Sequence, residues 1–152
     1  MENRILHVED NSDDVLLTAL AFRKAGVQLR IDVAIDGAKA IAKLQSQVGS
    51  PPVCVLLDVK LPCISGFEVL TWIRAHPFLK RLPVIMFTSS LLPQDINRAY
   101  DLGANSYLTK PSDLDLLIEL ARAIDHYWVR TNTQPPPASA LSEATPLAAT
   151  LS

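Results

Sequence analysis

The chain has 152 residues, which is the length of one domain with its own core. Apolar residues make up 49% of it and charged residues 20%, a balance typical of globular proteins that excludes a disordered or membrane-embedded chain. The net charge of -2 argues against the strongly basic surface of most nucleic-acid-binding proteins. We find no membrane-span or signal-peptide pattern and therefore expect a cytoplasmic protein.

Apolar runs alternate with amphipathic segments along the first 130 residues. The first run ends at Glu9, and Asn11 can cap the helix that follows. Ser65 and Glu68 have the spacing of a capping box, and Ser112 is the predicted cap of the last helix. We predict strands at 5–8, 30–35, 53–57, 83–87 and 106–109, and helices at 12–25, 38–47, 66–75, 93–102 and 112–130.

The run 53–57 is short and rich in β-branched residues, so we interpret it as a central strand covered on both faces. Asp58 follows it directly. A carboxylate in this position either caps the next helix or is a functional group at the carboxyl edge of the sheet, where open α/β folds bind ligands. Asp58 alone does not distinguish the two.

Five repeats of strand and helix predict a doubly wound α/β fold, with a five-stranded parallel sheet, helices on both faces and right-handed crossovers. From Thr131 the composition shifts to Pro, Ala, Thr and Ser, and Glu143 is the single charge that follows. We expect one domain over residues 1–130 and a flexible tail over 131–152. Cys54 and Cys63 are interpreted as reduced thiols.

Reactive side chains follow four of the five predicted strands, and the carboxyl ends of parallel strands share one edge. These side chains are Glu9, Asp10, Asp58, Thr88 and Lys110. Three carboxylates require a compensating cation in one pocket at neutral pH. Magnesium prefers oxygen ligands, whereas zinc would call for the His or Cys side chains that are missing from this set.

Such a pocket can transfer a phosphoryl group to a carboxylate. Asp58 would be the nucleophile, since an ionised carboxylate needs no general base. Lys110 and the metal would neutralise the transferred oxygens, and the Thr88 hydroxyl would donate a hydrogen bond to them. The sequence offers no residue poised to activate water, which indicates a lasting covalent mark and a switch rather than a hydrolase.

Several motifs occur in a fixed order: the pair Glu9-Asp10, then Asp58, Pro62 and Gly66 at four-residue spacing, then Thr88, then Tyr107-x-x-Lys110-Pro111. Together they resemble the response-regulator receiver domain of two-component signalling, over residues 3 to about 130. The resemblance implies a flavodoxin-like fold with strand order 2-1-3-4-5. It also implies phosphorylation of Asp58 by a histidine kinase.

The same resemblance implies roles for individual residues. Magnesium would be held by Asp10, Asp58 and the backbone carbonyl of Lys60, with Glu9 bound through water. A cis peptide before Pro111 would aim Lys110 into the pocket. Thr88 and Tyr107 would form a switch pair, in which the ring follows the hydroxyl inward. Lys60 and Ser90 occupy the positions that tune the lifetime of the phosphoryl group.

The segment 78–83 and the absence of an output domain resemble the small cyanobacterial and bacterial phytochrome response regulators. This narrower resemblance implies that the kinase is a phytochrome. We therefore expect a stand-alone response regulator, a signalling module rather than an enzyme. It would catalyse its own phosphorylation and slow dephosphorylation, and act through protein contacts without binding nucleic acid or membranes.

Three alternatives stay open. A phosphorelay intermediate would use the same Asp58 and pass the phosphoryl group to another histidine. A magnesium-dependent phosphatase with an Asp nucleophile, of the haloacid dehalogenase kind, would have a second Asp where this chain has Lys60. A flavodoxin-like electron carrier would need a phosphate-cradling turn after the first strand, where this chain has acids that repel phosphate.

The last predicted helix has two apolar stripes. The first stripe seats the helix on the sheet, and the second, on a neighbouring face, contains Leu116, Leu120, Ala123 and Tyr127. So wide an apolar arc on a surface helix is commonly covered. We expect a homodimer through Leu116, Leu120 and Tyr127, with docking of the tail over the same patch as the alternative.

Two further groups receive structural interpretations. His7 lies inside the first strand and is expected to be a packed or half-exposed sheet residue without a chemical role. Asp13 and Asp14 are interpreted as first-turn helix acids that add to the negative field of the pocket.

Overall fold

The computed structural model describes residues 3–136, in which strands and helices alternate as the apolar runs predict. The strands are β1 (Arg4–Val8), β2 (Arg30–Ala34), β3 (Val55–Leu57), β4 (Val84–Thr88) and β5 (Ser106–Thr109). The helices are α1 (Ser12–Lys24), α2 (Gly37–Ser46), α3 (Gly66–Ala75), α4 (Pro93–Asp101) and α5 (Leu114–Ile124), and α5 continues into the π-helical segment η1 (Asp125–Thr131).

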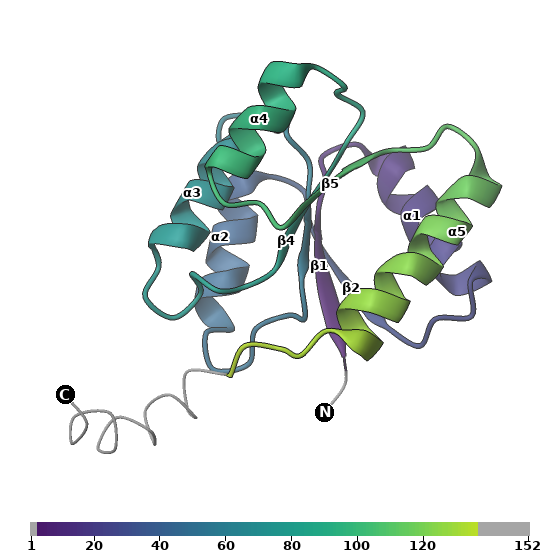
Figure 1. Cartoon of the computed structure of the whole chain (residues 1–152), viewed down its shortest axis with the longest axis horizontal. Helices are drawn as coiled ribbons and strands as arrows, with labels where there is room; N and C mark the ends of the chain where they lie inside the picture. Colours follow the sequence, from purple (N-terminus) through teal and green to yellow (C-terminus); the bar gives the residue numbers. More distant parts are fainter. Residues whose placement is uncertain (1–2, 137–152) are drawn as a thin grey trace.

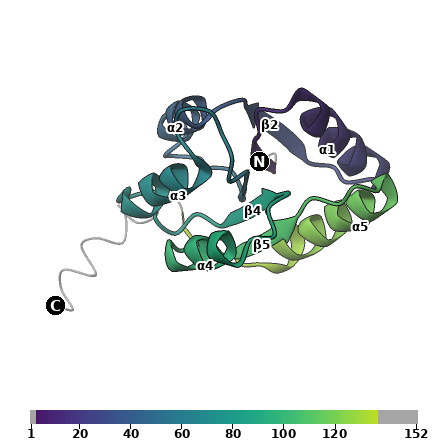
Figure 2. The ribbon, with the colours of Figure 1, turned by 90° about the horizontal axis from the view of Figure 1, so that it is seen from above.

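All neighbouring strands of the sheet are parallel, and their order is β2-β1-β3-β4-β5. Helices α1 and α5 cover one face, while α2, α3 and α4 cover the other (Figure 1 and Figure 2). This is the predicted doubly wound fold, and it confirms the strand order that the family resemblance implies.

An apolar core fills each face of the sheet. Leu6, Val55 and Leu57 belong to the core under α2, α3 and α4, whereas Ile5 and Leu56 belong to the core under α1 and α5. Successive residues of a strand point to opposite faces, so a strand covered on both sides reads as an unbroken apolar run. Every residue of β3 is fully buried, which confirms its interpretation as a central strand.

The predicted capping box at the start of α3 is confirmed. The amide of Glu68 donates to Ser65 Oγ at 3.2 Å, and the amide of Ser65 donates to Glu68 Oε2 at 2.7 Å. The predicted cap of α5 is wrong, because the cap is Asp113, which accepts a bond from the Asp115 amide at 2.7 Å. Since α5 begins at Leu114, Ser112 lies one residue too early to reach its free amides.

The end of the last helix also differs from the prediction of a regular helix to residue 130. Bonds five residues apart replace the α-helical spacing over η1. The Thr131 hydroxyl donates to the His126 carbonyl, and Arg130 Nε lies 2.9 Å from Asp125 Oδ2. These side-chain contacts match the wider turn of a π-helix. Of the predicted tail, residues 137–152 lie outside the described part of the chain.

Two smaller expectations are also tested. Cys54 is buried and Cys63 exposed, and both are free thiols, as predicted. Between residues 3 and 136, no helix is both long enough and apolar enough to cross a bilayer.

Candidate functional site

The site is built by the ends of neighbouring parallel strands. Backbone hydrogen bonds continue past the paired strands at two places: the Asp58 amide donates to the Val8 carbonyl at 3.2 Å, and the Lys110 amide donates to the Thr88 carbonyl at 2.8 Å. Residues that follow β1, β3, β4 and β5 are therefore delivered to one edge. The sequence predicts this convergence, because parallel strands have their carboxyl ends on the same side.

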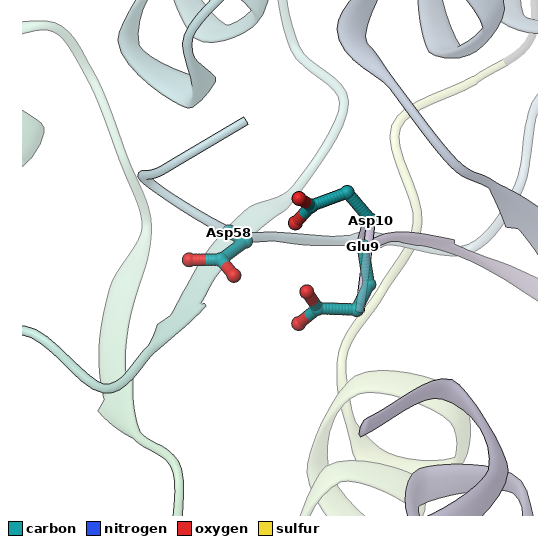
Figure 3. A group of neighbouring side chains, drawn as sticks. All are labelled: Glu9, Asp10 and Asp58. Carbon is teal, nitrogen blue, oxygen red and sulfur yellow. The ribbon is translucent and has the colours of Figure 1, made fainter. Parts of the chain in front are cut away.

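Three carboxyl groups gather at this edge, as Figure 3 shows. Glu9 and Asp10 follow β1, and Asp58 follows β3; one carboxylate oxygen from each lies within 4.8 Å of the others. Glu9 and Asp58 are buried, with 1% and 7% of their surface exposed, whereas Asp10 is exposed to water. The pocket therefore joins a dry side at Glu9 to an open side at Asp10.

Lys110 reaches into the pocket from the end of β5 and contacts three carboxylates. Its ammonium lies 2.9 Å from Asp58 Oδ2 and 3.0 Å from Asp14 Oδ2, and it also donates to Glu9 Oε1. The predicted cis peptide before Pro111 is wrong, because every peptide bond over residues 3–136 is trans. A trans bond is the lower-energy form even before proline, and the long lysine side chain reaches Asp58 from it.

Burial and charge act against each other at these groups. Burial raises the pKa of Glu9 to about 7, although hydrogen bonds from Lys110 and the Asn11 amide favour its ionised form. Burial alone would lower the pKa of Lys110, but its bonds to Glu9, Asp58 and Asp14 raise that pKa above its ordinary value. Lys110 is thus a permanent cation among a larger number of carboxylates.

Gly66 explains the spacing of the loop that follows Asp58. The Gly66 amide donates to the Val59 carbonyl at 2.9 Å, so the start of α3 packs on the backbone of the strand end. A Cβ atom at Gly66 would overlap the Asp58 carbonyl oxygen and lie 2.9 Å from its carbonyl carbon. Only glycine fits this close approach, and the motif from Asp58 to Gly66 is therefore a structural clamp on the site.

Comparison with known proteins agrees with this geometry. Residues 5–122 match the family described as the response regulator receiver domain. The chain belongs to this family. It is therefore a receiver domain, a phosphoacceptor module of two-component signalling.

Two curated relatives cover most of this receiver domain. The probable methanogenesis regulatory protein FilR2 of Methanothrix harundinacea is 39% identical over 137 residues, which are 88% of each chain. The response regulator Rcp1 of Synechocystis sp. is 37% identical over 135 residues, which are 86% of this chain and 92% of Rcp1.

Solved structures of two response regulators match the fold. The crystal structure of the phosphorylated cyanobacterial phytochrome response regulator RcpA has a TM-score of 0.82 at 35% identity, covering 90% of this chain and all of RcpA. The Mn²⁺-bound form of Rcp1 has a TM-score of 0.78 at 35% identity, covering 88% of this chain and 99% of Rcp1. The receiver domain is thus similar in fold and extent to both of these response regulators.

The three carboxylates of the receiver domain fit a hard divalent cation. Opposite ligands of a magnesium ion are about 4.2 Å apart, so oxygens that already lie within 4.8 Å need only small rotations to share one ion. Neither His nor Cys belongs to this group of ligands. The Lys60 amide donates to Asp58 Oδ1 at 3.3 Å, which holds the following loop near the pocket, while the predicted role of the Lys60 carbonyl stays a prediction.

Thr88 and Tyr107, the predicted switch pair, meet through Ser90. Thr88 is buried, and its hydroxyl accepts a long bond from the Ser90 amide at 3.4 Å. The Tyr107 hydroxyl donates to the Ser90 carbonyl at 2.9 Å, and Ser90 Oγ donates to Asp95 Oδ2 at 2.6 Å. Ser90 therefore connects the edge of the pocket to β5 and α4.

Two features of the receiver domain exceed what the sequence predicts. His7 is a packed sheet residue, as expected, but both of its ring nitrogens are buried without a hydrogen-bond partner. Burial and the nearby Lys110 lower the pKa of His7 to about 4. Asp14 is a first-turn acid, as expected, but it also contacts Lys110 directly. The sequence places Asp13 and Asp14 alike near the pocket, and nothing in it distinguishes the one that reaches Lys110.

Proposed function

We propose that this receiver domain accepts a phosphoryl group on Asp58 and signals through a changed protein-binding surface. The observation that carries the proposal is the buried Asp58 carboxylate, held 2.9 Å from the Lys110 ammonium beside Glu9 and Asp10. A carboxylate oxygen of Asp58 attacks phosphorus, and the bond from phosphorus to the donor's histidine nitrogen breaks. The electron pair of that bond stays on the imidazole, and Asp58 becomes an acyl phosphate.

The neighbouring residues supply the electrostatic part of the reaction. Lys110 exchanges its bond with Asp58 for one with a phosphoryl oxygen, and the Thr88 hydroxyl donates to another. Magnesium, held by Asp10, Asp58 and the Lys60 carbonyl with Glu9 through water, would neutralise further charge on these oxygens. The arrangement of three acids and the Mn²⁺-bound form of Rcp1 support this assignment. The domain thus catalyses its own phosphorylation.

Phosphorylation then acts on the switch pair. When the Thr88 hydroxyl turns toward the phosphoryl group, its long bond with the Ser90 amide is lost and the loop before α4 is free to move. Tyr107 must release the Ser90 carbonyl to turn inward. The surface around α4 and β5 therefore changes shape with the covalent state of Asp58.

The direct test is phosphorylation of the full chain by acetyl phosphate with magnesium, followed by intact mass measurement. Here the bond from phosphorus to the acetyl oxygen breaks and acetate leaves. Wild type should gain one phosphoryl group, and Asp58→Asn should gain none while keeping its circular dichroism spectrum. Wild type without an adduct, or Asp58→Asn with one, would contradict the proposal.

We propose a phytochrome histidine kinase as the phosphoryl donor. The similarity to the cyanobacterial phytochrome response regulator RcpA, which covers 90% of this chain, supports this choice. Phosphotransfer should be measured from two autophosphorylated kinases, a cyanobacterial phytochrome and an osmosensing kinase as control. We expect faster phosphotransfer from the phytochrome, and equal rates from the two kinases would count against a phytochrome as the donor.

We propose that the domain forms a homodimer through the outer face of α5 and η1. Leu116 and Tyr127 are 54% and 51% exposed, and Tyr127 lines a hollow together with Leu120 and Trp128. Large apolar side chains gathered on one face favour burial against a partner. Leu116→Lys should shift the sedimenting mass to that of a monomer, whereas Leu16→Lys, at an even more exposed leucine of α1, should not. A wild-type protein that already sediments as a monomer would contradict the proposed homodimer.

A further inference from the structure

The Lys110 ammonium donates one hydrogen bond to each of three different carboxylates. Asp58 comes from the end of β3, Glu9 from the end of β1, and Asp14 from the first turn of α1. An ammonium group has three donors and no more, so the set is complete. The Lys110 side chain is 13% exposed, and Asp14, at 38%, is the most exposed of its three partners.

The three partners differ in what else they must do. Asp58 receives the phosphoryl group under the proposed function, and its bond with Lys110 is then exchanged for one to a phosphoryl oxygen. Glu9 would also hold the magnesium ion through water under that proposal. Asp14 neither accepts the phosphoryl group nor belongs to the group of acids that could jointly hold a metal ion. Its contact with Lys110 is thus the one that can persist unchanged throughout the reaction.

The backbone fixes Asp14 for this purpose. Asn11 caps α1 by accepting a bond from the Asp14 amide at 3.0 Å, and the Asn11 amide donates to Glu9 Oε2 at 3.1 Å. One residue therefore sets the positions of two of the three carboxylates that hold Lys110. Asp13, the neighbouring acid in the same turn, is exposed and is not among the partners of Lys110.

We propose that Asp14 is a positioning residue that holds the Lys110 ammonium beside Asp58 during phosphoryl transfer. The inference rests on the proposed function and adds a residue to it. An acid in the first turn of a helix also stabilises the helix dipole, and that role belongs to Asp13 and Asp14 alike. What distinguishes them is the 3.0 Å contact.

The test compares wild type with Asp13→Asn, Asp14→Asn and Asp14→Glu. Phosphorylation by acetyl phosphate is followed over a range of magnesium concentrations, which separates the maximal rate constant from the magnesium concentration at half-maximal rate. Both Asn variants remove one charge from the same helical turn, so the magnesium concentration at half-maximal rate should rise by a similar factor in both. Only Asp14→Asn should lower the maximal rate constant, by a factor of about five to ten, because Lys110 is no longer fixed.

Asp14→Glu restores the carboxylate and should recover at least half of the wild-type rate constant. Equal maximal rate constants for Asp13→Asn and Asp14→Asn would overturn the inference, as would an Asp14→Glu variant as slow as Asp14→Asn. If wild type takes up no phosphoryl group, the proposed function itself fails and the role of Asp14 falls with it. If wild type is phosphorylated and the two Asn variants behave alike, only the role of Asp14 is lost.

Discussion

Replacement of Gly66 by alanine tests whether the loop after Asp58 clamps the site. The new Cβ would overlap the Asp58 carbonyl oxygen and lie 2.9 Å from its carbonyl carbon, whereas non-bonded carbon atoms sit about 3.5 to 4.0 Å apart. The backbone of either Asp58 or Gly66 must therefore move by at least roughly 0.6 to 1.1 Å. Both contacts are with backbone atoms, so no side-chain rotation relieves the overlap.

The cost should appear in both stability and activity. Forcing an extra atom into a packed site costs about 2 to 3 kcal/mol of unfolding free energy, to be measured by urea denaturation. A displacement of this size at the nucleophile can slow the reaction with acetyl phosphate by about 10- to 100-fold. Gly49→Ala is the matched control, because its Cβ meets nothing within 4 Å and its unfolding free energy should change by less than about 0.5 kcal/mol. A Gly66→Ala variant as stable and as reactive as Gly49→Ala would refute the reasoning.

Two further predictions concern pH. The pKa of His7 is lowered from 6.5 to about 4, so the unfolded chain binds more protons than the folded one in that window and acid destabilises the fold. His7→Leu removes both this titration and the unpartnered nitrogens. The unfolding free energy of His7→Leu minus that of wild type should therefore be about 2 kcal/mol larger at pH 5 than at pH 7.5. An equal difference at the two pH values would contradict this prediction. The pKa of Glu9 is raised from 4.5 to about 7, so its contribution to stability is present below pH 4.5 and is lost as the pH rises through 7. With a metal chelator present, the unfolding free energy of wild type should fall by about 2 kcal/mol relative to that of Glu9→Gln between pH 5 and 8. A difference between the two proteins that does not change with pH would exclude this account.

The strands and the pocket were predictable from the sequence because each depends on a local pattern. Apolar runs such as 53–57 mark buried strands, and parallel topology then brings the residues that follow them to one edge. Asp58 and Lys110 meet for this reason, although 52 positions separate them along the chain. The same logic placed Glu9 and Asp10 beside Asp58.

The remaining features depend on distances that no local pattern encodes. The contact between Asp14 and Lys110 arises from how α1 leaves β1, and a first-turn acid looks the same with or without it. Asp113 rather than Ser112 caps α5 because the helix begins at Leu114, and the neighbouring Ser and Asp are equally good caps by sequence alone. The bond between Ser90 and Asp95 likewise depends on the path of the loop before α4.

The position of the covalent mark is the most direct test of the account. After phosphorylation with magnesium and acetyl phosphate, borohydride reduces an acyl phosphate to an alcohol and converts the modified aspartate to homoserine, which tandem mass spectrometry locates. The account predicts homoserine at position 58 and unchanged aspartate at positions 10, 13 and 14. Homoserine at any of those three positions, with Asp58 intact, would contradict it.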